Sequence, residues 1–195
     1  MALYLATLAL YVSAQPSFAN IKQIIYGGTG CPIGSASALI TPDRSAFHVE
    51  FTELTALSGN NTVITDSRKN CQISVEFEYE KGWQFSLAAV GFTGSLHVQP
   101  NVTAVEKTSY YFQGESDTAN FQTVFNGPTS GDFNIVDVVP LDQPVWSGCT
   151  NDVALEINTQ VRFSNWSPSG PVSFITTSSE TGFALQSYQF NWKKC

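Results

Sequence analysis

The feature that most constrains the fold of this chain is an alternation of apolar and polar residues with a period of two. The pattern is clearest in residues 72–80, which read QISVEFEYE, and it recurs in residues 47–52 and 153–163. Successive side chains of a β-strand point to opposite faces, so this period predicts strands that bury one face and expose the other. No long segment carries the 3.6-residue apolar stripe of an amphipathic helix.

Many further short segments of this kind are separated by turns. Gly, Pro, Asn and Asp are frequent between them, as expected where strands are joined. Many short strands at this spacing are typical of two packed antiparallel sheets, so we predict an all-β fold, either an antiparallel β-sandwich or a jelly-roll-like domain. The further strands are expected at residues 21–26, 37–41, 62–65, 84–92, 96–99, 110–113, 121–125, 133–138, 172–177 and 183–192.

Composition supports a single globular domain. The 195 residues are 43% hydrophobic and only 13% charged, which excludes a disordered, collagen-like or coiled-coil chain. The net charge of −7 excludes the basic surface that binds nucleic acids or anionic membranes. We therefore expect no nucleic-acid partner and no membrane partner.

The first residues predict secretion to the extracellular space. Residues 2–12 form an apolar run of the length of a signal-peptide core, and the small-residue pattern VSA follows and ends at Ala14. We expect a signal peptide within residues 1–19, cleaved after Ala14 or, as second choice, after Ala19, and a single secreted β domain over residues 20–195. A membrane anchor is the alternative, but the run is too short to cross about 30 Å of hydrocarbon.

The cysteines agree with secretion. An even number in an oxidising compartment predicts two disulfides, and Cys31, Cys71, Cys149 and Cys195 allow three connectivities. We favour Cys31–Cys71 and Cys149–Cys195, because each bond joins cysteines that are neighbours in chain order and the second holds the C-terminal residue. Zinc binding is the alternative, but there is no CxxC pair and both histidines are far from any cysteine in the sequence, so we expect no metal.

Three Asn-X-Ser/Thr sequons also agree with secretion and predict a glycoprotein. They begin at Asn60, Asn101 and Asn165, each in a polar or turn-like stretch where a glycan could be attached. Pro168 directly follows the third sequon.

Acidic residues are concentrated in residues 106–156, which hold eight acids and one base. We interpret this region as a solvated acidic rim that keeps a secreted protein soluble. The alternative, a divalent-cation site, has no DxDxDG-type loop to support it. The acids are Glu106, Glu115, Asp117, Asp132, Asp137, Asp142, Asp152 and Glu156.

The common catalytic signatures are missing from the sequence. There is no GxSxG, no HExxH and no P-loop. The glycine-rich segment 27–35 lacks the Lys-Ser/Thr ending of a P-loop, so we predict a structural loop that turns around a disulfide. His48 and His97 lie in strand patterns and are interpreted as structural, and neither cleavage choice leaves a histidine at the N-terminus to bind copper. We expect no cofactor.

Carboxylates offer one route to catalysis. Glu76, Glu78 and Glu80 fall on one face of one predicted strand, with successive Cα atoms about 6.6 to 7 Å apart. Glycosidases use two carboxyl groups at comparable separations. Exposed strand faces carry glutamates for solubility more often, so we hold catalysis as an alternative.

Aromatic residues offer a route to binding, because flat rings can stack on sugars. Most of the tryptophans are expected in the core. Trp166 lies inside a sequon between turn residues, where exposure is expected, and adjacent residues Tyr110 and Tyr111 must point to opposite faces of a strand. We predict Trp166 and one of Tyr110 or Tyr111 as ligand-binding residues.

Several motifs together resemble one known family. They are GTGCPIGS at residues 28–35, RKNC at 68–71, GWQF at 82–85, SYYF at 109–112, WSGC at 146–149, LEINT at 155–159 and NWKKC at 191–195. This set, which includes all four cysteines in order, is similar to the secreted fungal proteins grouped as domain of unknown function 4360. The resemblance implies a small, secreted, disulfide-bonded β-protein, and it brings no reaction and no catalytic residues.

Because no motif identifies a reaction, the sequence predicts only the class of function. The leading hypothesis is a non-enzymatic extracellular binding module, with the character of an effector or elicitor, that acts on a cell-wall glycan or a host-surface protein. A glycoside-acting enzyme that uses the strand carboxylates is the first alternative. A structural wall glycoprotein without a discrete ligand is the second.

Overall fold

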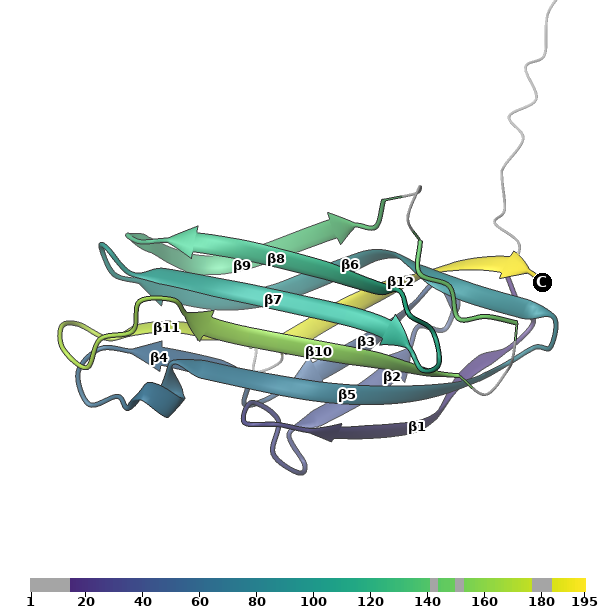
Figure 1. The fold of residues 1–195 in the computed structure, drawn as a ribbon, viewed down its shortest axis with the longest axis horizontal. Helices are drawn as coiled ribbons and strands as arrows, with labels where there is room; N and C mark the ends of the chain where they lie inside the picture. The colour runs from purple at the N-terminus through teal and green to yellow at the C-terminus, as the bar shows by residue number, and fades with distance from the viewer. Residues whose placement is uncertain (1–14, 141–143, 150–152, 177–183) are drawn as a thin grey trace, which may run out of the picture.

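The fold is a sandwich of two antiparallel β-sheets, as predicted from the alternation (Figure 1). The computed structural model describes residues 15–140, 144–149, 153–176 and 184–195. Within these residues the single helix is a short 3-10 turn, η1 (Ile64–Asp66). No helix of the described residues has the length and apolar character needed to cross a membrane.

The two sheets have five and seven strands. In the five-stranded sheet the spatial order is β1 (Ala19–Gly27), β5 (Arg68–Tyr79), β10 (Ala154–Phe163), β7 (Thr103–Phe112) and β8 (Thr118–Asn126). The seven-stranded sheet follows the order β2 (Ala36–Ile40), β3 (Ala46–Phe51), β12 (Ala184–Lys194), β6 (Trp83–Val98), β11 (Ser173–Thr176) and β4 (Thr55–Ser58), and β9 (Thr129–Val138) also pairs with β6.

Strand β6 organises the second sheet. Its pairing with β12 runs from Trp83 to Phe92, β11 pairs with its far end, and β9 pairs with it from Ala89 to Val98. The prediction of two separate strands at residues 84–92 and 96–99 was therefore wrong. Gly94 does not interrupt the ladder, because it pairs with Phe133 of β9 and keeps the strand conformation.

One predicted strand is absent and one observed strand was missed. Residues 62 and 63 lead into η1 and residues 64 and 65 belong to it, and the Asp66 carboxylate accepts a hydrogen bond of 3.0 Å from the Val63 backbone N–H. The strand of this region is instead β4, in which Ala56 and Ser58 are buried. Small side chains on its inner face give this strand a weak apolar pattern, which explains the error.

The core between the sheets is rich in aromatic rings. The inward positions predicted for residues 72–80 are confirmed, because Ile73, Val75, Phe77 and Tyr79 are each at most 2% exposed. Phe77 meets Phe85 of the opposite sheet edge-on, with ring centroids 5.3 Å apart. Such a pair contributes about 0.5–1.5 kcal/mol beyond the burial of its area, so these rings stabilise the packing of one sheet on the other.

Both disulfides have the predicted pairing. Cys31 and Cys71 are joined with Cα atoms 5.4 Å apart, and Cys149 and Cys195 with Cα atoms 5.8 Å apart. They close sequence separations of 40 and 46 residues. By the chain-entropy estimate each bond stabilises the fold by about 4 kcal/mol.

The glycine-rich segment is a structural loop beside the first disulfide. Gly28 has a φ of +153°, and a Cβ atom there would collide with the carbonyl oxygen of Asn70. The Gly30 N–H donates a hydrogen bond of 2.9 Å to that same oxygen. Only glycine allows this approach of two backbone segments, which supports the predicted structural role.

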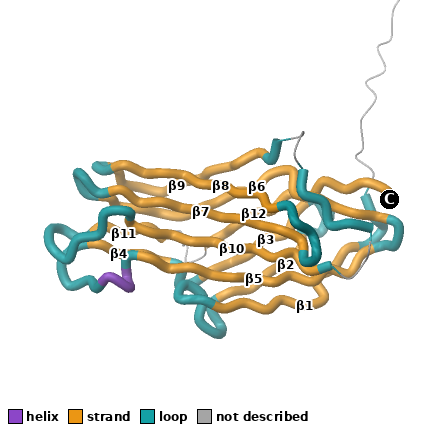
Figure 2. Tube along the Cα trace, in the orientation of Figure 1, coloured by secondary structure: helices purple, strands orange, loops and turns teal. Residues whose placement is uncertain are grey.

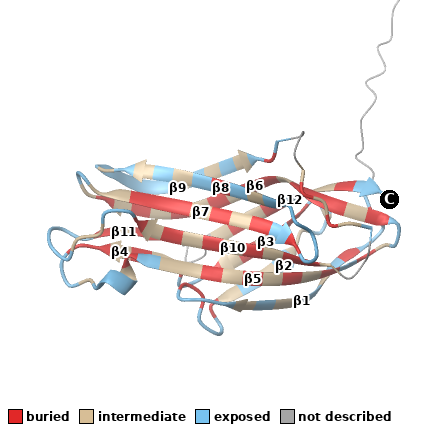
Figure 3. Ribbon diagram, viewed as in Figure 1, coloured by how far each residue is buried: buried red, intermediate tan, exposed pale blue. Residues whose placement is uncertain are grey.

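Loops lie at both ends of the sandwich, and a further group lies along its edge beside β1 (Figure 2). The C-terminus and the start of β1 lie at one end, while η1 and the turns β6–β7 and β10–β11 lie at the other (Figures 1 and 2). Burial is densest on the central strands, whereas β8 and β9 are largely exposed or half-buried (Figure 3).

Candidate functional site

The outer face of the five-stranded sheet carries a cluster of amide side chains. Strand pairing places residues 70, 160, 107 and 122 side by side in one row across β5, β10, β7 and β8, and residues 72, 158, 109 and 120 in the next row. Residues paired across antiparallel strands share a face. We call the six amides of these rows the amide platform: Asn70, Gln72, Asn120, Gln122, Asn158 and Gln160.

Hydrogen bonds hold one side of the amide platform in place. The Asn158 amide donates to the Gln72 side-chain oxygen at 2.9 Å, and the Gln72 amide donates to Glu156 Oε2 at 3.3 Å. The Ser74 hydroxyl donates to Glu156 Oε1 at 2.8 Å. This chain of bonds fixes the amide orientations, so these groups are ordered before any ligand arrives.

A hollow of about 200 Å³ lies between β7 and β10 within the platform. Its walls are Lys107, Ser109, Asn158 and Gln160. Lys107, Ser109 and Gln160 make no side-chain hydrogen bond or ion pair among the described residues, so their polar groups are available to a ligand. The hollow thus offers both donors and acceptors, as a polyhydroxylated ligand requires.

Tyr111 borders the platform, whereas its neighbour does not reach the surface. Tyr111 is 37% exposed and pairs with Glu156, in the row next to the amides. Tyr110 is fully buried, and its ring is stacked on Phe121 at 6.1 Å. Burial raises the pKa of Tyr110 to about 12. The two rings therefore point to opposite faces as expected, and Tyr110 is removed as a ligand-binding candidate because it lies in the core.

Trp166 lies beyond the end of β10 and outside the two rows of the platform. It is half-buried in the β10–β11 loop, packs against the core, and its indole N–H donates a hydrogen bond of 3.0 Å to the Thr62 hydroxyl. The structure does not bring Trp166 and Tyr111 into one site. Trp166 instead joins two loops at one end of the sandwich.

The three candidate glutamates lie along the last part of β5 and directly after it, beside the first half of β1, and their environments differ. Glu76 forms an ion pair of 3.5 Å with Lys22. Glu80 accepts a hydrogen bond of 2.7 Å from the Ser17 backbone N–H and lies 3.8 Å from the Lys194 ammonium. Glu78 is exposed and has no side-chain partner among the described residues.

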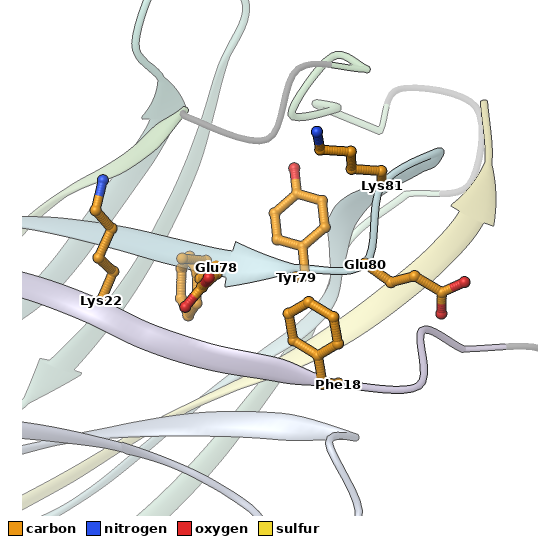
Figure 4. A pocket seen from close by; sticks show the side chains of 7 residues that line it. Phe18, Lys22, Glu78, Tyr79, Glu80 and Lys81 are labelled. Atoms are coloured by element: carbon orange, nitrogen blue, oxygen red, sulfur yellow. The ribbon is translucent and has the colours of Figure 1, made fainter.

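A pocket of about 420 Å³ adjoins two of these carboxylates (Figure 4). Phe18 and Lys22 line it from β1 and the preceding residue, and Glu78, Glu80 and Lys81 line it from the end of β5. The hydrogen bond from Ser17 lowers the pKa of Glu80, with a smaller contribution from Lys194, which keeps this carboxyl ionised. A glycosidase needs one protonated acid beside its carboxylate, and Glu80 does not fit that role.

One member of the predicted acidic rim lies in the core. Glu106 is fully buried on the inner face of β7, and burial raises its pKa to about 8. The expectation that all eight acids are solvated was therefore wrong for Glu106. The alternation along the strand indicated this burial, because Ala104 and Thr108, two residues away on either side, also face inward.

The histidines do not form a ligand cluster. His97 lies 3.1 Å from the Ser130 hydroxyl through Nδ1 and 2.8 Å from the Gln99 amide through Nε2, so its neighbours engage both ring nitrogens. His48 borders a hollow of about 250 Å³ on the outer face of the seven-stranded sheet, beside Gly91 and Val136. Across the described ranges, no group of three or more His, Cys, Asp or Glu side chains is placed to hold a metal ion.

Sequence reasoning missed the amide platform. Each strand shows its polar residues at alternate positions, as in LEINTQVRF at residues 155–163, but alternation alone indicates only a solvated face. The order of strands β5, β10, β7 and β8 in space brings the amides together, and that order differs from the order in the chain.

The fold and this face define a disulfide-bonded β-sandwich protein with an ordered polar surface. The chain belongs to the family described as "Domain of unknown function (DUF4360)", which matches residues 18–195, in agreement with the resemblance found in the sequence motifs. An "Uncharacterized secreted protein" from Arthroderma benhamiae is 31% identical over 180 residues, which cover 92% of this chain and 73% of that protein.

Among solved structures, the enzymatically active domain of tailspike protein 4 from bacteriophage CBA120 is similar at 17% identity with a TM-score of 0.28. The match covers 90% of this chain but only 20% of the tailspike chain.

Proposed function

We propose that this protein is a secreted, non-enzymatic module that binds a cell-wall or host-surface glycan through the amide platform. In this role it would act as an effector or elicitor at that surface. The observation that carries the proposal is a pair of polar rows across four neighbouring strands, in which β5, β10 and β8 supply six amides and β7 supplies Lys107 and Ser109. Secretion is supported by the secreted relative, by the two disulfides and by the apolar run at the start of the chain.

Amides suit a glycan because each one carries donors and an acceptor, as each sugar hydroxyl does. The chain of bonds from Asn158 through Gln72 to Glu156 holds part of the surface ready, which reduces the entropy lost on binding. Tyr111 at the border adds an exposed ring on which the apolar face of a sugar can stack. The platform therefore combines the two contacts that recognise an uncharged polysaccharide.

The test is a pull-down on insoluble chitin, cellulose and β-glucan. The double variant Asn158→Ala and Gln160→Ala removes two central amides, and we expect it to weaken binding roughly tenfold or more, since each lost hydrogen bond contributes about 0.5–1.5 kcal/mol. The matched control is Asn134→Ala with Gln189→Ala, which removes two exposed amides from the seven-stranded sheet. Equal loss in both variants, or binding by neither wild type nor control, would contradict the proposal.

A second candidate function is glycoside hydrolysis, which the pocket beside Glu78 and Glu80 favours. Reducing-sugar release from the same insoluble glycans separates the two. Binding without release supports the binding module, and release that is lost in Glu78→Gln supports the enzyme. If the protein shows no binding and no release, the result supports the remaining hypothesis, a structural wall glycoprotein.

A further inference from the structure

The three sequons meet at one end of the sandwich, although they are far apart in the chain. The Asn165 amide donates to the Asn101 carbonyl oxygen at 2.5 Å, and the Asn60 backbone N–H donates to the Gly170 carbonyl oxygen at 2.9 Å. The turns that hold them, β4–η1, β6–β7 and β10–β11, lie together in Figure 1. All three asparagines begin the same Asn-X-Ser/Thr pattern, but their side chains have different surroundings.

Asn165 uses both polar atoms of its side chain. Its Oδ1 accepts a hydrogen bond of 2.8 Å from the Thr103 backbone N–H, while its Nδ2 donates to the Asn101 carbonyl. The side chain thereby ties the β10–β11 loop to the β6–β7 turn. Glycosylation bonds a sugar to Nδ2, the atom that lies against this turn.

Asn101 and Asn60 leave the same atom free. Asn101 is exposed in the β6–β7 turn with a φ of +64°, and its side-chain amide has no partner among the described residues. Asn60 is exposed as well, and only its Oδ1 is engaged, by the Gly170 N–H at 3.1 Å. Both residues are exposed, and neither Nδ2 atom donates a hydrogen bond within the part of the chain that the structure describes.

We propose that Asn60 and Asn101 carry N-linked glycans and that Asn165 stays unmodified as a structural amide that joins two loops. The inference rests on the secretion part of the proposed function. In the transfer, Nδ2 loses one proton and bonds to C1 of an oligosaccharide, which leaves its lipid pyrophosphate donor. At Asn165 the new sugar would press on the β6–β7 turn, and Pro168 stiffens the chain just after this sequon.

The glycans would thus project from the loops at one end of the molecule, while the strands that carry the amide platform bear none. An unmodified Asn165 also leaves the Trp166 indole free to keep its hydrogen bond to Thr62. The sequon end is then a solvated, glycan-coated tip.

The experiment uses the full chain secreted by a yeast. Deglycosylation with an N-glycanase in ¹⁸O-water converts each glycosylated Asn to labelled Asp, and peptide mapping then locates the label. We expect label at residues 60 and 101 and none at 165. Asn60→Gln and Asn101→Gln should each remove one glycan, whereas Ser167→Ala, which destroys the third sequon but keeps Asn165, should leave the glycan number unchanged.

A second measurement tests the structural role of Asn165. We expect Asn165→Ala to lower the melting temperature by several degrees, because it removes two hydrogen bonds between loops. Asn101→Gly should leave it nearly unchanged, because glycine accepts the positive φ of this turn and the side chain that is removed makes no hydrogen bond among the described residues. Label at residue 165, or an unchanged melting temperature in Asn165→Ala, would overturn the assignment of Asn165. Secreted protein without any label would overturn the two glycan sites while leaving the proposed function standing, and failure to enter the medium would contradict secretion itself.

Discussion

Inside the sandwich, the Thr108 hydroxyl donates a hydrogen bond of 3.1 Å to Glu106 Oε1, and the second carboxyl oxygen of Glu106 has no partner among the described residues. The Thr108 and Thr159 hydroxyls are 2.8 Å apart, and Gln186 of the opposite sheet donates to Thr159 at 2.6 Å. Tyr188 completes the chain by donating to Gln186 at 2.6 Å. A buried carboxyl group is thus connected to a polar network that spans both sheets.

This arrangement makes stability depend on pH. Burial raises the pKa of Glu106 from 4.5 to about 8, and the nearby Asp137 contributes in the same direction. A raised carboxyl pKa means that the folded protein holds a proton which the unfolded chain has lost, so the stabilisation is complete below pH 4.5 and declines as the pH rises to about 8. We expect the free energy of unfolding to fall by up to about 1.4 kcal/mol per pH unit in this window.

Melting temperatures of the wild type and Glu106→Gln between pH 4 and 9 measure this effect. The amide cannot ionise, so we expect a flatter curve for the variant and a crossover toward alkaline pH. Glu78→Gln serves as the surface control and should follow the wild-type curve. Parallel curves for the wild type and Glu106→Gln would show that Glu106 is not the responsible group.

The start of the mature chain is a second prediction. Pro16 and Ala19 are buried, Ala19 pairs with Tyr79, and the Ser17 N–H is bonded to Glu80. Signal cleavage after Ala19 would remove these contacts, whereas cleavage after Ala14 keeps all of them. We therefore expect the secreted protein to begin at Gln15, as measured by N-terminal sequencing.

A truncated chain tests whether the contacts of residues 16–19 stabilise the fold. We expect protein that starts at Asn20 to melt several degrees lower than protein that starts at Gln15, because the first pair of β1 with β5 is lost. Secreted protein that begins at Asn20 and melts at the same temperature would contradict the prediction.

The fold followed from the sequence because the alternation is strong where strands are buried on one face. Ile73, Val75 and Phe77 gave both the strand and its inner face, and the order of cysteines gave the disulfide pairing. The same reasoning failed for Glu106, since a charged residue in a strand is normally solvated and only packing of the second sheet encloses it.

The candidate site was less accessible to sequence reasoning. Tyr110 and Tyr111 were correctly expected on opposite faces, but nothing in the sequence decides which ring faces outward until the neighbouring strands are placed. The amide platform depends on β5 and β7 lying on either side of β10, a contact between segments far apart in the chain. Pairings of this kind are set by the whole sandwich and not by local pattern.

Glu78 provides a third prediction. It is exposed and has no side-chain partner among the described residues, so Glu78→Gln should change the free energy of unfolding by no more than about 0.5 kcal/mol. Glu80→Gln should cost more, because the amide accepts a weaker hydrogen bond from Ser17 and loses the attraction of Lys194. Chemical denaturation of both variants measures the difference, and equal stabilities would contradict it.

The last prediction separates the two aromatic residues that remain as candidates. Tyr111→Ala removes an exposed ring beside the platform, so we expect weaker glycan binding with little change in melting temperature. Loss of a ring at a binding hot spot typically costs about 2 kcal/mol or more, which corresponds to roughly thirtyfold in affinity.

Trp166→Ala should behave in the opposite way. It removes a half-buried ring that packs against the core and a hydrogen bond to Thr62, so we expect a lower melting temperature and unchanged affinity. Trp166→Phe is the matched variant, because it keeps most of the packing and removes only the indole N–H. Binding isotherms on the glycan retained in the pull-down, measured together with melting curves, would refute this assignment if Trp166→Ala weakened binding while Tyr111→Ala did not.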